Sequence, residues 1–160
     1  MEELHEVYLN IGSNIEPEKN LRESIRLLRK HGQVKAISNA WQSHAFGSDG
    51  PDFLNACVLF LTSLEAPGLK EQIIRPLEAE LGRVRSPDKN APRTIDIDII
   101  LFDDEPFVGE FWSNAFVVVP LADLLPNFHH PFNYERLVHV AAHMRRQTWI
   151  MARPEVLNSV

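Results

Sequence analysis

The sequence has one cysteine, no long apolar run and no excess of basic residues. The only cysteine among its 160 residues is Cys57, so no disulfide can form within the chain, which suits a reducing compartment. No apolar run approaches the roughly 20 residues that span a bilayer. The acidic start MEELHEVYLN lacks the basic and apolar segments of a signal peptide. The net charge of -6 argues against a nucleic-acid surface. We therefore expect a cytoplasmic protein with neither a membrane nor a nucleic-acid partner.

Length and composition favour a single domain over residues 1–160. An apolar fraction of 44% in a chain of this length is enough for one hydrophobic core. Residue periodicity and turn residues predict strands at 6–14, 33–46, 53–64 and 94–102, and helices at 16–32 and 66–84. Pro76 is expected to kink or break the second helix, and Gly82 to end it. The order predicts an α+β fold, a ferredoxin-like β-α-β-β-α-β sandwich.

The C-terminal third is less regular and is expected to add one strand and helices. Residues 103–114 are expected to form a loop, 115–121 a strand, 121–125 a helical turn and 134–146 a helix. The strand is predicted because its apolar run is rich in valine. His129 and His130 fall in a turn that we expect to be exposed.

Two carboxylates interrupt the apolar run RTIDIDIILF at residues 93–102. Because strand side chains alternate between faces, Asp96 and Asp98 share one face while Ile97 and Ile99 share the other. Two acids this close repel unless a cation lies between them. Mg²⁺ is the natural candidate, since it takes one or two carboxylates and completes its shell with water and substrate phosphates.

Basic residues surround this acidic pair. Arg83, Arg85, Lys89 and Arg93 all lie within a short stretch before it. Carboxylates that hold a metal beside guanidinium groups that hold phosphate oxygens make a polyphosphate site. The simpler interpretation is a solvated edge strand whose acids pair with nearby arginines. The chain has no G-x-x-x-x-G-K-[ST] loop, so a nucleotide would be bound in another way.

At these residues the chain resembles the 6-hydroxymethyl-7,8-dihydropterin pyrophosphokinase family. The resemblance rests on APRTIDIDII at 91–100, supported by NIGSN at 10–14, PDFLNACV at 51–58, LEAELGRVR at 77–85 and FVVVPLADLLP at 116–126. It implies a ferredoxin-like fold and the use of ATP with two Mg²⁺ ions. The implied reaction moves a diphosphate onto the hydroxymethyl group of a reduced pterin and releases AMP. A monomer or weak dimer is expected.

The resemblance also implies roles for individual residues. Asp96 and Asp98 would bind both metal ions and, with Arg85 and Arg93, form the catalytic group. The implied pterin-binding residues are Ser43, Phe46, Phe53, Asn55 and Phe116. The implied ATP-binding residues are Glu78, Arg83, Arg85, Lys89, Arg93 and Ile99. Asp98 is also a candidate acceptor for the hydroxyl proton.

Several of these residues have simpler interpretations, and the chain departs from the family in places. Glu78 and Arg83 would otherwise be an exposed charge pair at a helix end, and Asn55 a strand residue satisfied by backbone. Trp112 either covers the mouth of a site or fills space left by the short 103–115 loop. Asn114 stands where the family leads us to expect an arginine. A second hypothesis is therefore a divergent pterin-binding paralogue with weak or altered diphosphotransferase activity.

Overall fold

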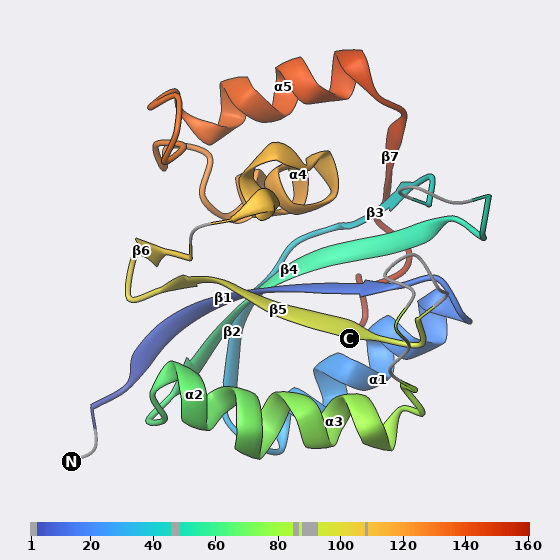
Figure 1. Cartoon of the computed structure of the whole chain (residues 1–160), viewed down its shortest axis with the longest axis vertical. Coiled ribbons are helices and arrows are strands. Elements are labelled where there is room, and N and C mark those ends of the chain that lie inside the picture. The colour runs from blue at the N-terminus through green and yellow to red at the C-terminus, as the bar shows by residue number, and fades with distance from the viewer. Residues whose placement is uncertain (1–2, 46–48, 85–86, 88–92, 108) are drawn as a thin grey trace.

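The computed structural model describes residues 3–45, 49–84, 87, 93–107 and 109–160 (Figure 1). Seven strands form one antiparallel sheet, with helices on both of its faces. The strands are β1 (His5–Ser13), β2 (Gln33–Ile37), β3 (Ala40–Ser43), β4 (Phe53–Thr62), β5 (Asp96–Phe102), β6 (Glu105–Pro106) and β7 (Ile150–Arg153). The helices are α1 (Pro17–Arg29), α2 (Ala66–Leu69), α3 (Arg75–Glu80), α4 (Ala115–Leu124) and α5 (Leu137–Gln147), with a π-helical turn at Lys70–Ile74 and a 3-10 turn at Glu110–Ser113.

The sheet places β1 at its centre, between β5 and β4. Its strand order is β6-β5-β1-β4-β3-β7. The remaining strand, β2, also pairs with β4, at residues that follow those paired with β3. The strand predicted at 33–46 is therefore two strands, which pair with the same edge of β4. The interruption lies at Ser38, whose backbone N–H donates to Cys57 O (2.9 Å) and whose Oγ accepts from Cys57 N (2.8 Å). A side chain that replaces one ladder contact lets the strand stop and restart.

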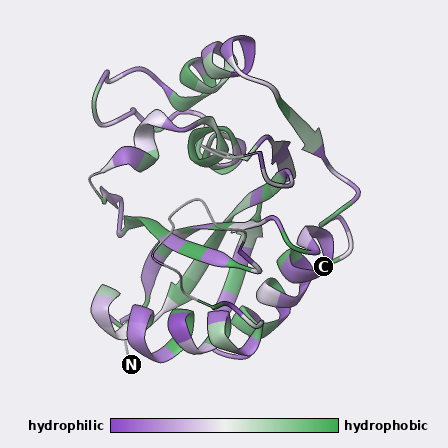
Figure 2. Ribbon diagram, turned by 45° about the vertical axis from the view of Figure 1, so that its right-hand side comes forward, coloured by the Kyte–Doolittle hydropathy of each residue, from purple (hydrophilic) through white to green (hydrophobic). Residues whose placement is uncertain are grey.

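Each face of the sheet has its own apolar core. One core lies under α1 and the α2–α3 segment, and includes Leu9, Ile97 and Ile99. The other lies under α4 and α5, and includes Leu59 and Trp112. Figure 2 shows apolar residues concentrated on the central strands and on α4, while the outer helices carry more polar residues. The helices within the described ranges are all too short or too polar to traverse a lipid bilayer.

The second predicted helix is confirmed, and its irregularity lies next to Pro76. Proline has no N–H to donate within the helix, and the turn before it is π-helical, with Arg75 N–H bonded to Lys70 O. The helix ends at Gly82, which has a φ of 85°, a backbone conformation that favours glycine. Arg83 N–H then bonds to Glu78 O (3.0 Å), the closing contact of a Schellman motif.

The predicted strand at 115–121 is wrong, because these residues form most of α4. Val117, Val118 and Val119 are all buried, since α4 packs between the sheet and α5. A helix that is covered on most sides is apolar all round and loses the period that would identify it. The predicted turn at 121–125 is the last turn of this helix. The predicted helix at 134–146 is confirmed as α5, and the chain continues into β7.

The connection before α4 is held by buried polar contacts. Trp112 is 1% exposed, and its Nε1 donates to Phe107 O (2.8 Å). It therefore fills space in the core instead of covering a site. His130 is also buried, and its Nε2 bonds to Trp112 O (2.7 Å), so the expectation of exposure is wrong for this residue.

Candidate active site

The two aspartates of β5 lie on the face of the sheet that α4 covers in part. Ile97 and Ile99 enter the core on the other face, so the alternation predicted for this strand is confirmed. Asp96 pairs across the sheet with Gly12 of β1, and Gly12 pairs with Asn55 of β4. The register therefore brings one acid and one predicted pterin-binding amide to the same level of the sheet, on the two strands that flank β1, although 41 residues separate them in the chain.

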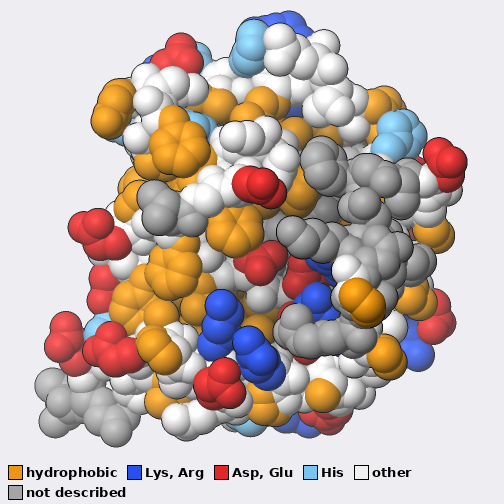
Figure 3. Space-filling view, in the orientation of Figure 1, with side chains coloured by type: hydrophobic (Ala, Val, Ile, Leu, Met, Phe, Trp, Pro, Cys, Tyr) orange, Lys and Arg blue, Asp and Glu red, His pale blue; other side chains and the backbone are white. Residues whose placement is uncertain are grey.

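Five side chains form what we call the charged cluster: Glu78, Arg83, Arg93, Asp96 and Asp98. Arg83 Nη1 donates to Asp96 Oδ1 (2.6 Å) and to Glu78 Oε2 (2.9 Å). Arg93 Nη1 donates to the other oxygen, Asp96 Oδ2 (2.8 Å). In Figure 3, acidic and basic side chains lie together near the middle of the face that is shown. Both oxygens of Asp96 are thus paired with guanidinium groups.

Glu78 is a buried member of this cluster. Its side chain is 4% exposed and that of Arg83 is 12% exposed, which overturns the interpretation of an exposed charge pair. Glu78 Oε2 also accepts from the backbone N–H of Ile97 (2.9 Å). One carboxylate oxygen therefore links the end of α3 to β5 between the two aspartates.

Asp98 is the one acid of the charged cluster, among its described members, whose pKa is strongly shifted. Burial and, next, the nearby carboxylates of Asp96 and Glu78 raise the pKa of Asp98 to about 7, although Arg83 and Arg93 act in the opposite direction. The ionised form is thus poorly compensated by the protein alone. A cation at this position would favour it.

Asn14 ties the charged cluster to the turn before β4. Its N–H donates to Arg93 O (3.1 Å), and its Oδ1 accepts from Arg93 N (2.6 Å). Its Nδ2 contacts Pro51 O (3.4 Å). Asn14 is 3% exposed. It was missed by the sequence analysis, although a buried asparagine that ends an apolar strand is a signal for such a link.

We call Ser43, Phe53, Asn55 and Phe116, with the neighbouring Asn10, the ring side of the site. Ser43 and Asn55 are buried, and Phe53 and Phe116 are partly buried. Asn55 Oδ1 accepts from Asn10 Nδ2 (3.3 Å). Asn10 was also missed, although its position two residues before Gly12 puts it on the same face of β1.

Polar atoms on the ring side have few partners. Ser43 Oγ and Asn10 Oδ1 are buried and have no hydrogen-bond partner among the described residues. No ring contact joins Phe53 and Phe116 in the described part of the chain, so the two rings do not pack on each other. The ring side therefore has unused hydrogen-bonding capacity.

Of the remaining predicted residues, three lie outside the described part of the chain and one lies elsewhere in the structure. Phe46, Arg85 and Lys89 lie outside the described residues. Ile99 is described, but its side chain is buried in the core under α1 and α3, away from the acids. The side chain of Ile99 thus does not line the candidate site.

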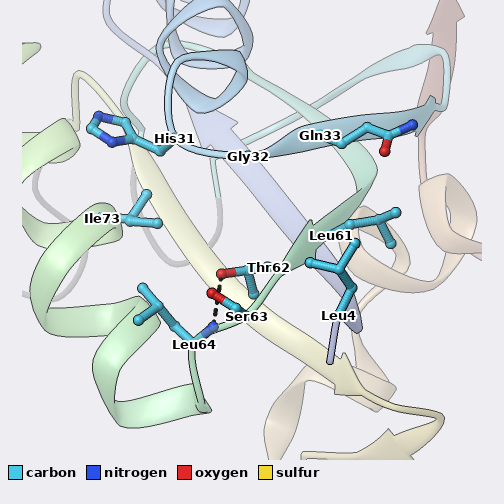
Figure 4. A pocket seen from close by; sticks show the side chains of 9 residues that line it. All are labelled: Leu4, His31, Gly32, Gln33, Leu61, Thr62, Ser63, Leu64 and Ile73. Carbon is cyan, nitrogen blue, oxygen red and sulfur yellow. Dashed lines mark hydrogen bonds between the residues drawn. The ribbon is translucent and has the colours of Figure 1, made fainter. Parts of the chain in front are cut away.

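A hollow in another part of the protein is not the candidate site. It has a volume of about 400 Å³, and His31, Gly32 and Gln33 line it together with Thr62 and Leu64 (Figure 4). No carboxylate and no predicted site residue contributes to its lining. It therefore lacks the chemistry that the charged cluster provides.

An acidic pair beside arginines, on one face of an antiparallel sheet, has the chemical groups that can hold a phosphorylated ligand and a metal ion. Residues 8–126 match the family model described as 7,8-dihydro-6-hydroxymethylpterin-pyrophosphokinase (HPPK). The chain belongs to this family.

Individual relatives agree with the family match. The chain is 31% identical over 141 residues to 2-amino-4-hydroxy-6-hydroxymethyldihydropteridine pyrophosphokinase of Synechocystis, covering 81% of this chain and 71% of that protein. It is 35% identical over 129 residues to the protein of the same name from Bacillus subtilis, covering 73% and 76%. The crystal structure of Plasmodium falciparum HPPK-DHPS with pteroate has a TM-score of 0.66 at 10% identity, covering 91% of this chain and 43% of that chain. This last similarity concerns the fold alone.

Proposed function

We propose that the chain transfers the diphosphate of ATP to the hydroxymethyl group of 6-hydroxymethyl-7,8-dihydropterin, releasing AMP, as a step of folate biosynthesis. One observation carries the proposal: Asp96 and Asp98 lie together with Arg83 and Arg93 inside the segment that matches the pyrophosphokinase family. Residues 1–160 are taken as one catalytic domain, because a single sheet provides both sides of the site.

The donor set fits Mg²⁺. Two carboxylates on one face of β5 are the number that protein sites for Mg²⁺ commonly supply, with water and substrate phosphates completing the shell. The raised pKa of Asp98 marks a position where negative charge is undercompensated. No group of three or more metal-binding side chains occurs among the described residues. When bound, Mg²⁺ would neutralise phosphate charge and orient the reacting phosphorus atoms.

The arginines would act by binding and orienting ATP. The pterin hydroxyl attacks the β-phosphorus and AMP leaves, so charge moves among phosphate oxygens while little covalent chemistry falls to the protein. Arg83 and Arg93 already pair with Asp96, which holds their guanidinium groups beside the metal-binding pair. Groups fixed in advance stabilise developing charge without the cost of reorganisation.

The ring side is proposed to bind the pterin. Asn55 offers a carboxamide that can match the hydrogen-bonding edge of a heterocycle, and Ser43 an unused hydroxyl. Phe53 and Phe116 would stack on the ring from separate elements. We also infer the ferredoxin-like sandwich, supported by the order β5-β1-β4 with β2 and β3 along the outer edge of β4.

The alternative of a pterin-binding paralogue with weak or altered activity is not favoured. A pure binding protein has little reason to keep Asp98 buried beside Asp96, where its ionised form is unfavourable. The family match also runs through both acids. Asn114, at the residue where an arginine was expected, caps α4 and bonds through its N–H to Phe111 O (3.1 Å). This departure concerns the strength of phosphate binding and leaves the acidic pair unchanged.

The test is AMP release from ATP, Mg²⁺ and 6-hydroxymethyl-7,8-dihydropterin. The wild type should form AMP, and Asp96→Ala or Asp98→Ala should reduce the rate by a factor on the order of a thousand. Glu80→Ala, which removes an exposed carboxylate from the same helix as Glu78, is the matched control and should leave the rate unchanged. A folded wild type that binds the pterin without forming AMP would instead support the paralogue.

A further inference from the structure

Three strands end together at the ring side of the site. The strand β7 lies beside β3 at one edge of the sheet (Figure 1). Ser43 is the last residue of β3, and it pairs with Phe53, the first residue of β4, and with Ile150, the first residue of β7. These three residues are therefore the last row of the ladder, and two of them belong to the ring side. The end of a ladder opens more readily than its middle.

The row beyond this one is joined by side chains. The register, continued by one residue, places Asp52, His44 and Trp149 side by side on the three chain segments. His44 Nδ1 bonds to Asp52 Oδ1 (3.0 Å), and the His44 ring stacks on that of Trp149, with 4.5 Å between the ring centroids and 17° between the ring planes. Two side-chain contacts thus extend the sheet past its last row.

Gln42 adds a second set of contacts next to the same row. It lies one residue before Ser43, so its side chain points to the opposite face of the sheet. Its Nε2 donates to Asp52 Oδ2 (2.9 Å), and its Oε1 accepts from Nη1 of Arg153 in β7 (2.7 Å). The side chains that join the three strand ends are called the strand-end clasp: Gln42, His44, Asp52, Trp149 and Arg153.

The Gln42 carboxamide has a definite orientation, because each of its ends has a charged partner. Hydrogen bonds from His44 and, next, from Gln42 lower the pKa of Asp52 below its ordinary value, so this carboxylate is ionised and only accepts. The Arg153 guanidinium group only donates. Rotating the carboxamide by half a turn would place donor against donor and acceptor against acceptor. Gln42 therefore bridges β4 and β7 in one orientation.

The clasp is too exposed to contribute much to the free energy of unfolding. The side chain of His44 is 69% exposed and that of Asp52 is 37% exposed, and exposed charge pairs stabilise proteins little. Local opening of the last row is different, because the free energy of opening is small at a fraying end. A modest contribution there changes the fraction of molecules in which Ser43 and Phe53 lie side by side.

From these contacts we infer that Gln42 is a positioning residue for the bound heterocycle. By keeping the last row closed from one face of the sheet, it holds the Ser43 hydroxyl and the Phe53 ring at a fixed spacing on the other face. The inference rests on the proposed function, because it takes Ser43 and Phe53 as contacts of the pterin. The apparent Kd of a ligand rises when the fraction of protein with a competent site falls.

The test replaces Gln42 with methionine, which keeps the length of the side chain and forms neither hydrogen bond. In the ligand-free protein, amide hydrogen exchange at the end of β3 and the start of β4 should become about fivefold faster. The Kd of 6-hydroxymethylpterin is measured with Mg²⁺ and an ATP analogue that has a methylene bridge between its α and β phosphates. This Kd should rise about threefold, and the Kd of the analogue should stay the same.

Controls separate positioning from a general loss of structure. Gln33→Met changes an exposed glutamine of β2 that pairs with Leu61 at the other end of β4, and it should change neither quantity. Asp52→Ala opens the clasp from the β4 side and gives the same test if Gln42→Met does not fold.

The outcomes distinguish this inference from the proposed function. Unchanged exchange in the folded variant overturns the clasp, and faster exchange with an unchanged pterin Kd overturns the positioning role of Gln42. A wild type that binds the ATP analogue but no pterin overturns the proposed pterin site and, with it, this role.

Discussion

The charged cluster and the ring side of the site differ in how their polar atoms are satisfied. In the charged cluster, both oxygens of Asp96 and one oxygen of Glu78 accept hydrogen bonds from arginines or backbone. On the ring side, Ser43 Oγ and Asn10 Oδ1 are buried without a partner among the described residues. The strand residues of both sides belong to one sheet, in which β1 lies between β5 and β4.

The difference fits the two tasks that we propose for these sides. A cluster that handles phosphate charge works best if its dipoles and charges are fixed before the substrate arrives. A surface that recognises a flat heterocycle needs free donors and acceptors, which are costly until a ligand uses them. Substitutions on the charged side should therefore lower stability, while those on the ring side should change binding more than stability.

The largest effect is expected from Glu78→Ala. The change leaves the Ile97 N–H and part of the Arg83 guanidinium without a buried acceptor. The free energy of unfolding should fall by about 3–5 kcal/mol. Urea unfolding of this variant is compared with Glu80→Ala, which should stay within about 0.5 kcal/mol of the wild type because Glu80 is exposed. Equal losses in both variants would show that Glu78 is not the link between α3 and β5.

A smaller change in the free energy of unfolding is expected when the pH is raised, because Asp98 titrates. Because the pKa of Asp98 is raised from 3.8 to about 7, the folded protein binds a proton that the unfolded chain has released between these values. In buffer with EDTA, stability should therefore fall by about 2–4 kcal/mol as the pH rises from 4 to 8. Asp98→Asn should lose this part of the pH dependence, and Mg²⁺ at pH 8 should restore stability to the wild type only. Parallel pH profiles for the two proteins would contradict the assignment.

Asn14→Ala should affect the charged cluster and the segment that leads into β4, because Asn14 contacts both. The variant loses the contacts to Arg93 N and Pro51 O, so unfolding should become easier by about 1–2 kcal/mol. AMP formation should fall further than stability predicts, by about tenfold, because Arg93 is no longer held beside Asp96. Asn20→Ala also removes a buried carboxamide but should leave the rate unchanged. A rate loss of the same size in both variants would argue against a specific link.

The smallest change in stability, with the opposite sign, is expected on the ring side. Ser43→Ala removes a buried hydroxyl that has no partner, so stability should be unchanged or higher by up to about 1 kcal/mol. Pterin affinity should nevertheless fall by about tenfold. Ser38→Ala is the matched control, because the Ser38 Oγ accepts from Cys57 N and its loss should destabilise the protein. Thermal unfolding and titration with 6-hydroxymethylpterin measure both quantities.

Local patterns predicted the parts of the fold that depend on neighbours in the chain. Alternation placed Asp96 and Asp98 on one face, and Pro76 and Gly82 correctly marked an irregularity and an end of the second helix. The strand predicted at 115–121 was wrong because valine favours strands when only local preference is considered. In the folded protein, packing between the sheet and α5 favours a helix instead. Local preference is weak when both faces of an element are buried.

The candidate site could be predicted only in part for a similar reason. The acidic pair and Arg93 lie within a few residues of one another, so spacing alone was enough to group them. The burial of Glu78 depends on a contact with Ile97, 19 residues away, and the contact of Asn10 with Asn55 depends on the register between β1 and β4. Such contacts between distant residues have no periodicity that a single sequence displays.

The π-helical turn before Pro76 limits how this chain can tolerate a change in the length of the helix. A π turn holds one residue more than a regular turn, and each residue of an α-helix advances by about 100° around the axis. Removing one residue from Lys70–Ile74 would restore regular helical bonds but would rotate everything on one side of the deletion. Glu78 would then point away from β5. The extra residue of the π turn therefore sets the rotation of the helix at which Glu78 reaches the backbone of Ile97.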